Sequence, residues 1–234
     1  MKLSIIIPVY NEEKTIVSLL KKIEKIKISK NVIIVNDGSN DHTKYILNNL
    51  DRRFYDKIIN HKKNYGKGAA IITASKYIKG DIVIIQDADL EYDPLDYKKL
   101  INPIIKKEYK VVYGSRVLGR NRYYNSKNFI SIARIFLNHL LTLFSNIINN
   151  QKLTDAHTCY KVFHKDVFIK LKLKEKDFAF CPEVNSKISR LNLNIKEIKI
   201  KYKGRTKSEG KKIQFMDGVY AIFALIKYGI LNRW

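Results

Sequence analysis

The sequence has 234 residues, of which 45% are apolar, so it can bury a sizeable core and extensive disorder is excluded. Its two cysteines, Cys159 and Cys181, exclude a disulfide framework, a zinc ribbon and a redox CxxC motif, and they favour a reducing compartment. Forty-five Lys and Arg against 22 Asp and Glu leave a net charge of +23, which fits nucleic acid, anionic lipid or phosphorylated small molecules as partners and fits lysine-rich codon usage equally well.

The first 116 residues alternate between short apolar runs and segments that repeat Ile and Leu at helical spacing. The runs predict strands at 3–7, 31–35, 57–60, 81–86 and 110–113, and the segments between them predict helices near 12–28, 41–50, 66–78 and 94–107. Because the runs are apolar throughout, both faces of each strand should be covered. The order predicts an α/β fold with a mostly parallel sheet flanked by helices.

A polar cluster follows each predicted strand. The clusters are PVYNE (8–12), NDGS (36–39), HKKNYGKG (61–68), DADLE (87–91) and GSR (114–116). Since ligands of such sheets bind beyond the carboxyl ends of the strands, we expect all five clusters to meet at one edge and form the site.

The pattern changes after residue 116. The segment from Gly114 to Thr154 contains no acidic residue, and a long helix is predicted at 128–149. Its polar positions form one narrow stripe and most of the remaining surface is apolar, so the helix needs an apolar partner beyond its own domain. A half-exposed strand is predicted at 195–202, and an almost wholly apolar helix at about 213–231. We predict one domain over 1–234, with a catalytic half at 1–116 and a basic, amphipathic half at 117–234.

The DADLE cluster suggests a metal site. Asp87 and Asp89 place two carboxylates on the same side of the chain, and Glu91 continues the spacing. Carboxylate oxygens, waters and substrate phosphates are what a hard divalent cation prefers. The alternative is an ordinary helix N-cap, in which an Asp accepts backbone N–H bonds.

Two other clusters have the chemistry of nucleotide binding. Asp37 could accept an N–H of a base, although an ordinary turn explains NDGS as well. The NYGKG segment offers backbone N–H groups and the Lys67 ammonium at a helix start, which suits phosphate, but it lacks the spacing of a P-loop. The five histidines form no spaced set of ligands, and only His61, beside the third strand end, is placed to contribute.

Together these segments resemble family 2 glycosyltransferases of the GT-A fold, and in particular the branch of dolichyl- or polyprenyl-phosphate sugar synthases. Later segments extend the resemblance over nearly the whole chain: DAHTCYK (155–161), FCPEV (180–184) and GRTKSEGKKI (204–213). Two positions depart from the common pattern. Asn36 stands where the family often has Asp, and Glu91 stands where many relatives have Gln, which adds negative charge at the metal.

The resemblance implies roles for individual residues. It implies that Mg²⁺ or Mn²⁺ is held by Asp87, Asp89 and Glu91. It implies that the nucleotide sugar is bound by Pro8, Val9, Tyr10, Glu12, Asp37, Lys67, Asp87, Ala88 and Asp89. Phosphate of the acceptor or donor is expected to be bound by Arg116, Arg134, Lys161 and Arg205. The residues expected to act in catalysis are Asp89, Arg116, Arg134, Asp155 and Glu183.

The implied reaction is inverting transfer of a hexose from a UDP- or GDP-linked donor to a polyprenyl or dolichyl phosphate. The alternative is a soluble family 2 enzyme of polysaccharide or glycolipid synthesis that transfers to a sugar hydroxyl. That reaction needs a general base, for which Asp155 and Glu183 are the candidates. A nucleic-acid-binding protein is a third hypothesis, but no RRM, helix-turn-helix or zinc-finger motif supports it, and we expect no nucleic acid partner.

The basic and apolar segments of the second half predict where the protein works. Residues 196–212 contain eight basic and two acidic residues, directly before the apolar 213–231 helix. An interfacial helix beside a polybasic segment is a reversible membrane anchor. Because no uncharged apolar stretch is long enough to span a bilayer, we expect a cytoplasmic protein bound peripherally to an anionic membrane surface. The competing expectation is a homodimer or an integral-membrane partner that covers the apolar helices.

Overall fold

The computed structural model describes residues 1–119, 129–205 and 215–231; at 129–131, 133–134 and 215–217 it describes the backbone only. Seven strands form one sheet in the order β3-β2-β1-β4-β6-β5-β7. The strands are β1 (Leu3–Val9), β2 (Lys30–Asn36), β3 (Lys57–Asn60), β4 (Ile82–Ile85), β5 (Val111–Ser115), β6 (Lys161–His164) and β7 (Ile195–Lys199).

The sheet is mostly parallel. β1 pairs in parallel with β2 and β4, β2 pairs in parallel with β3, and β5 pairs in parallel with β7. β6 runs antiparallel to both β4 and β5, so these two strands point in the same direction. The carboxyl ends of β1 to β5 therefore lie on one edge, which confirms the predicted meeting of the polar clusters.

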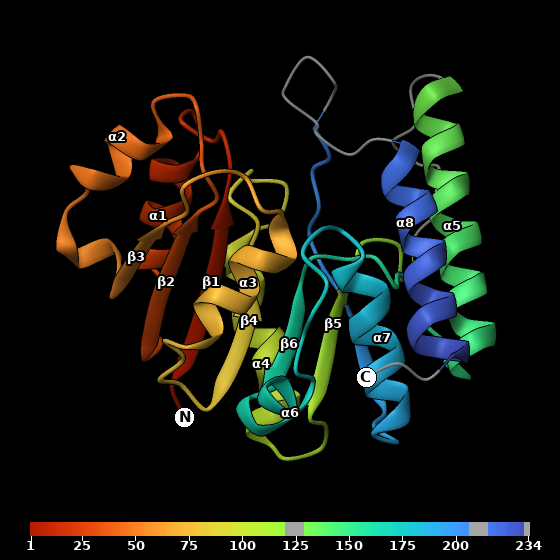
Figure 1. The fold of residues 1–234 in the computed structure, drawn as a ribbon. Helices are drawn as coiled ribbons and strands as arrows, with labels where there is room; N and C mark the ends of the chain where they lie inside the picture. The colour runs from red at the N-terminus through yellow and green to blue at the C-terminus, as the bar shows by residue number, and fades with distance from the viewer. Residues whose placement is uncertain (120–128, 206–214, 232–234) are drawn as a thin grey trace.

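Helices flank the sheet on both sides. They are α1 (Ile16–Glu24), α2 (Thr43–Asn48), α3 (Lys67–Ser75), α4 (Tyr97–Ile105), α5 (Phe129–Asn149), α6 (Lys165–Lys170), α7 (Phe180–Arg190) and α8 (Phe215–Leu225). α5 and α8 run side by side at the end of the molecule away from β3 (Figure 1). The core is continuous across the sheet, because the central strands are apolar on both faces and their side chains are fully buried.

β6 is the strand that the sequence prediction missed, together with α6 and α7. It is only four residues long and begins with Lys161, whose side chain is completely buried. The Lys161 ammonium donates to the carbonyl oxygen of Ala156 at 2.8 Å and lies 3.9 Å from the centre of the Tyr113 ring. These contacts compensate for the burial of the ammonium, and an apolar pattern cannot reveal them.

Two predicted helices differ from the observed ones. Residues Pro94–Asp96 form a 3₁₀ turn before α4, because the Asp93 side chain accepts a bond from the N–H of Leu95. The predicted 213–231 helix is α8 followed by a π-helical turn, Ile226–Ile230. Arg190 holds this turn against α7 by donating to the carbonyl oxygens of Tyr228 and Gly229 at 2.9 and 3.0 Å.

Helix α5 packs with its polar stripe inward. Thr142, Ser145 and Asn149 are buried against the protein, where Thr142 donates to the carbonyl of Asn138 and Asn149 donates to Ser145. The exposed apolar side chains of α5 and α8 are Ile132, Phe136, Leu137, Leu140, Leu143, Phe144, Ile147, Tyr220, Ile222 and Phe223. Within the described ranges, no helix combines the length and apolar character needed to cross a bilayer. We call the exposed apolar side chains of α5 and α8 the apolar face.

Candidate functional site

Side chains of two strand ends and one returning segment converge at the carboxyl edge of the sheet. Glu12 follows β1, and Asp87, Asp89 and Glu91 follow β4. Residues 201–205, which we call the strap, follow β7 and lie against them. The strap is fixed by backbone bonds, since the N–H of Lys203 donates to the carbonyl oxygen of Glu91 at 2.9 Å.

Lys67 and Arg205 together engage all three carboxylates of the DADLE cluster. The Lys67 ammonium pairs with Asp87. Arg205 lies 3.3 Å from Asp89, and its backbone N–H donates to Glu91 at 2.6 Å. Among the described residues, no three His, Cys, Asp or Glu side chains are grouped as a metal site. Each of the three carboxylates expected to hold a metal therefore has a basic partner, and Arg205 is the partner of two of them.

The negative charge of this cluster shifts the pKa values of Asp89 and Lys67. Burial, the Asp87 carboxylate and the Glu91 carboxylate raise the pKa of Asp89 to about 7, and Arg205 opposes the rise. Burial alone would lower the pKa of Lys67, but the Asp87 carboxylate outweighs burial and raises it. A carboxylate that is destabilised by two others is a good ligand for a cation, so the donor set fits a hard divalent ion.

The guanidinium of Arg205 makes its hydrogen bonds with Glu12. Two guanidinium nitrogens donate to the two Glu12 oxygens at 2.8 and 3.1 Å, the bidentate geometry that arginine forms with carboxylates. The sequence predicted a nucleotide role for Glu12 and a phosphate role for Arg205, and the structure brings the two residues together. Pro8 and Val9 are the last two residues of β1, which extends two residues beyond the predicted strand 3–7, and Tyr10 follows it.

Asp37 fixes the loop that leads into α3. Its carboxylate bonds to His61 Nδ1 at 2.7 Å and accepts from the N–H groups of Tyr65 and Gly66 at 3.0 and 2.8 Å. Gly38 has φ of +66°, and a side chain there would collide with the backbone of Lys63 in this loop. Asp37 therefore shapes the edge of the site, while its predicted contact with a base stays a prediction.

Arg116 is held by Asp155 in a second bidentate pair. Arg116 Nε and Nη2 donate to the two Asp155 oxygens, each at 2.7 Å, and the guanidinium lies 5.3 Å from the ring centre of Tyr202 in the strap. Burial would raise the pKa of Asp155, but Arg116 holds it below its ordinary value. This geometry favours a positioning role for Asp155 over the predicted role of a base.

Two residues to which the sequence analysis gave no role make further contacts near Arg116 and Asp155. Glu197 on β7 accepts from the N–H groups of Thr154 and Asp155 at 2.7 and 3.0 Å, which fixes the segment that carries Asp155. The Tyr202 hydroxyl donates to Glu91 at 2.8 Å, so the strap contacts both the acidic cluster and Arg116. In the sequence, Tyr202 is only the last position of the alternating pattern that predicts a strand at 195–202.

Glu183 lies in the first turn of helix α7. It is completely buried and pairs with Lys187 at 2.8 Å, and it accepts from the N–H groups of Lys174 and Glu175 at 2.8 and 2.9 Å. The Glu183 carboxylate therefore stabilises the packing of the 174–175 segment on α7, and its role as a base stays a prediction. The side chain of Arg134, on the first turns of α5, lies outside the described residues.

We expect Glu183→Ala to lower the free energy of unfolding by about 3–5 kcal/mol, because it leaves the buried Lys187 ammonium without its carboxylate. Glu24→Ala, which removes an exposed pair with Arg53, should cost less than about 1 kcal/mol. Urea unfolding measures both. A stable Glu183→Ala protein without activity would instead support the role of a base.

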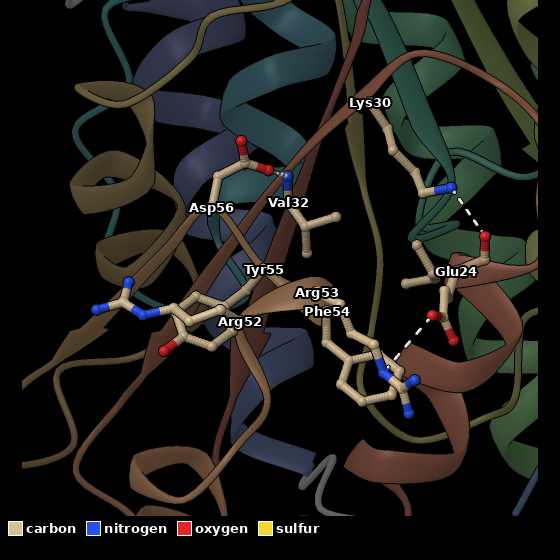
Figure 2. Close-up of a pocket in the computed structure, with 9 residues that line it drawn as sticks. Glu24, Lys30, Val32, Arg52, Arg53, Phe54, Tyr55 and Asp56 are labelled. Atoms are coloured by element: carbon tan, nitrogen blue, oxygen red, sulfur yellow. Dashed lines mark hydrogen bonds and ion pairs between the residues drawn. The ribbon is translucent and has the colours of Figure 1, made fainter.

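A hollow of about 240 Å³ opens at the opposite, amino-terminal edge of the sheet (Figure 2). Lys30, Arg52, Arg53 and Asp56 are among the residues that line it. The Lys30 ammonium donates to the carbonyl oxygens of Glu24 and Ile26, and Arg53 pairs with Glu24. Two of its cations are thus satisfied internally, and it lies away from the strand ends where the polar clusters meet.

Comparison with known proteins gives the relatives of this chain. Residues 4–172 match the family described as glycosyl transferase family 2. The UDP-N-acetylglucosamine–dolichyl-phosphate N-acetylglucosaminyltransferase of Methanococcus voltae is 28% identical, and the match covers 96% of each chain. A dolichyl-phosphate beta-glucosyltransferase of Trichomonas vaginalis is 26% identical, with 99% of this chain and 75% of the relative covered. The dolichol-phosphate mannosyltransferase of Pyrococcus furiosus is 32% identical over 58% of this chain and 42% of its own.

Solved structures show the same fold. Glucosyl-3-phosphoglycerate synthase from Mycobacterium tuberculosis, in complex with Mn²⁺, UDP and phosphoglyceric acid, superimposes with a TM-score of 0.71 at 16% identity, over 98% of this chain and 78% of that one. A structure of the same protein with Mg²⁺ and UDP gives a TM-score of 0.68 at 17% identity, over 97% and 79%. These likenesses confirm the predicted GT-A fold.

Proposed function

Since this chain belongs to glycosyl transferase family 2 and is therefore a glycosyltransferase, we propose that it transfers a hexose from a nucleotide diphosphate sugar to a polyprenyl or dolichyl phosphate with inversion. The three named relatives carry different sugars in their names but share dolichyl or dolichol phosphate. That shared acceptor is the observation that carries the proposal. The donor in this proposal is a UDP- or GDP-linked hexose.

The donor would bind at the carboxyl edge of the sheet. Pro8, Tyr10 and the loop shaped by Asp37 would surround the nucleoside, and Lys67 at the start of α3 would face the diphosphate. Asp87, Asp89 and Glu91 would hold Mg²⁺ or Mn²⁺, the ions present in the solved relatives with UDP. When bound, the ion would neutralise charge on the leaving diphosphate.

The acceptor side of the site would work without a general base. A phosphate monoester has its second pKa near about 6, so it is an anionic nucleophile at neutral pH. It needs to be positioned opposite the leaving group, and Arg116, oriented by Asp155, can do this with a fixed guanidinium. Arg134 would belong to the acceptor-binding half, which we propose at residues 117–234 of one domain. Lys161 was predicted to bind the same phosphate, but its side chain is completely buried and its ammonium donates to the carbonyl oxygen of Ala156, which does not fit that role.

A screen of nucleotide sugars tests the proposal. Purified protein is incubated with UDP- and GDP-linked hexoses and a divalent cation, with and without a short-chain polyprenyl phosphate. One donor should be consumed rapidly only when the polyprenyl phosphate is present. Donor turnover that depends on an added sugar acceptor instead would support the alternative enzyme, which transfers to a sugar hydroxyl.

We also propose that the enzyme meets its lipid acceptor at an anionic cytoplasmic membrane surface without spanning it. The apolar face is made of exposed apolar side chains of the neighbouring helices α5 and α8, on a protein with a net charge of +23. No acidic residue lies between Gly114 and Thr154, so α5 contributes no negative charge that would repel anionic lipid. A second copy of the chain or an integral-membrane protein is the competing occupant of this face.

Vesicle flotation should show binding to liposomes that contain anionic lipid, and high salt should weaken it, because apolar insertion and basic attraction both contribute. The double variant Ile147→Asp/Phe223→Asp should reduce binding about tenfold or more, since it puts charge on the apolar face. Tyr45→Asp, on an equally exposed side chain of the distant α2, is the control and should bind like the wild type. A protein that stays unbound at low salt and sediments as a dimer would contradict membrane docking.

A further inference from the structure

Arg205 occupies the centre of the acidic site as an internal cation. Its guanidinium makes two hydrogen bonds to Glu12 and an ion pair with Asp89, while its backbone N–H donates to Glu91. The side chain is only 17% exposed, so water weakens these pairs little. One arginine thus neutralises carboxylates that come from two different strand ends.

The strap holds Arg205 in this place. Lys201 donates its N–H to Asp96 at 2.7 Å, Tyr202 donates its hydroxyl to Glu91 at 2.8 Å, and Tyr202 forms a backbone bridge with Tyr92. These contacts fix the strap across the mouth of the acidic cluster. The position of Arg205 therefore follows from several independent bonds rather than from a loose surface side chain.

One hydrogen-bond donor of the Arg205 guanidinium is left over by these contacts. The Arg205 Nε–H is buried, and it has no hydrogen-bond partner in the part of the chain that the structure describes. A buried charged donor without a partner is costly, so this N–H favours any ligand that brings an acceptor to it. An anionic oxygen is the acceptor that a guanidinium binds best.

We propose that Arg205 competes with the divalent cation for Asp89, so that the metal binds tightly only when Arg205 has left this carboxylate. The inference rests on the proposed function and adds a regulation of the same site. In this structure Asp89 Oδ1 accepts the N–H of Glu91 and Asp89 Oδ2 faces Arg205, so a divalent cation would compete with the guanidinium for this carboxylate, and the two positive charges would repel each other.

The consequence is coupling between metal and nucleotide. A metal ion alone has to displace Arg205 from Asp89, and it leaves the guanidinium with Glu12 as its remaining anionic partner. A nucleoside diphosphate bound together with the metal supplies phosphate oxygens that can receive the released guanidinium. Metal and nucleotide should therefore raise each other's affinity, and Arg205 should be responsible for part of that coupling.

The test is Mn²⁺ binding to the full chain without nucleotide, measured at fixed pH by titration calorimetry or by the electron paramagnetic resonance of free Mn²⁺. Arg205→Ala should bind Mn²⁺ about fivefold more tightly or better than the wild type, because it removes the competing charge. Arg205→Lys keeps a cation and should lie closer to the wild type. Lys203→Ala, on an exposed residue of the same strap, is the matched control and should change the affinity by less than about twofold.

A second measurement is the gain in Mn²⁺ affinity when UDP or GDP is added. This gain should be smaller in Arg205→Ala than in the wild type, and thermal unfolding should show that the variant is folded. Equal or weaker Mn²⁺ binding by Arg205→Ala, or no binding by either protein, would overturn the proposal. Neither readout uses sugar transfer, so a failed transfer assay with the expected Mn²⁺ result would count against the proposed reaction alone.

Discussion

Asp89→Asn should abolish sugar transfer, with a loss in kcat/KM of about a hundred- to a thousandfold or more, while the protein stays folded. Asp89 is buried beside two other carboxylates, and both raise its pKa. A neutral amide cannot replace its carboxylate as a ligand of a hard cation. The assay is donor turnover at saturating Mg²⁺ or Mn²⁺. Asp93→Asn is the matched control in the same loop, since Asn can still cap the 3₁₀ turn.

The same variant should stabilise the metal-free protein. The pKa of Asp89 is raised from 3.8 to about 7, so the folded state disfavours its charged form. Such a group destabilises the fold as pH rises above the unfolded value, and the penalty is complete above about pH 7. Asp89→Asn removes it and should raise the free energy of unfolding by about 1–3 kcal/mol at pH 8, with no gain below about pH 4. Near-native activity, or a chelator-insensitive wild type, would contradict a metal role for Asp89.

Arg116→Lys should lower kcat/KM for the polyprenyl phosphate about ten- to a hundredfold, with a smaller effect on the donor. Lysine keeps the charge but loses the planar fork that Asp155 orients, so the acceptor phosphate would be bound less firmly and less precisely. Arg116→Ala is the less informative variant, because an unpaired buried Asp155 should also cost about 3–5 kcal/mol of stability.

Asp155→Asn separates positioning from base catalysis. If Asp155 orients Arg116, the variant should act mainly on the KM of the acceptor and should leave the shape of the pH profile unchanged. If Asp155 were a general base, the variant should lower kcat and remove the acidic limb of the profile. Equal effects of Arg116→Lys on donor and acceptor would contradict an acceptor-phosphate role for Arg116.

The sequence was sufficient to predict the sheet edge that carries the site, for a physical reason. Strands buried on both faces appear as uninterrupted apolar runs, and polar residues accumulate where such runs stop. The five clusters could therefore be placed on one edge, and the acidic cluster recognised, without any tertiary information. Resemblance to a family added the roles of individual residues.

The sequence could not predict which partners the charged residues choose. Lys161 begins a buried strand because Tyr113 and the carbonyl of Ala156 compensate for its charge, and these contacts depend on the fold. Arg205 and Glu12 are far apart in the chain yet form a bidentate pair, and Asp155 and Glu183 each have a cationic partner, Arg116 and Lys187. Long-range pairing of charges is set by tertiary structure, so a local pattern cannot reveal it.

The central claim is that the nucleophile is a lipid phosphate, and paired acceptors test it most directly. The enzyme is given its preferred nucleotide sugar and either a short-chain polyprenyl phosphate or the polyprenol of the same chain length, and the lipid product is analysed by mass and by ³¹P NMR. We predict a glycosyl phosphodiester of inverted anomeric configuration from the phosphate and no product from the alcohol. Glycosylation of the polyprenol or of a sugar hydroxyl at a comparable rate would contradict the account.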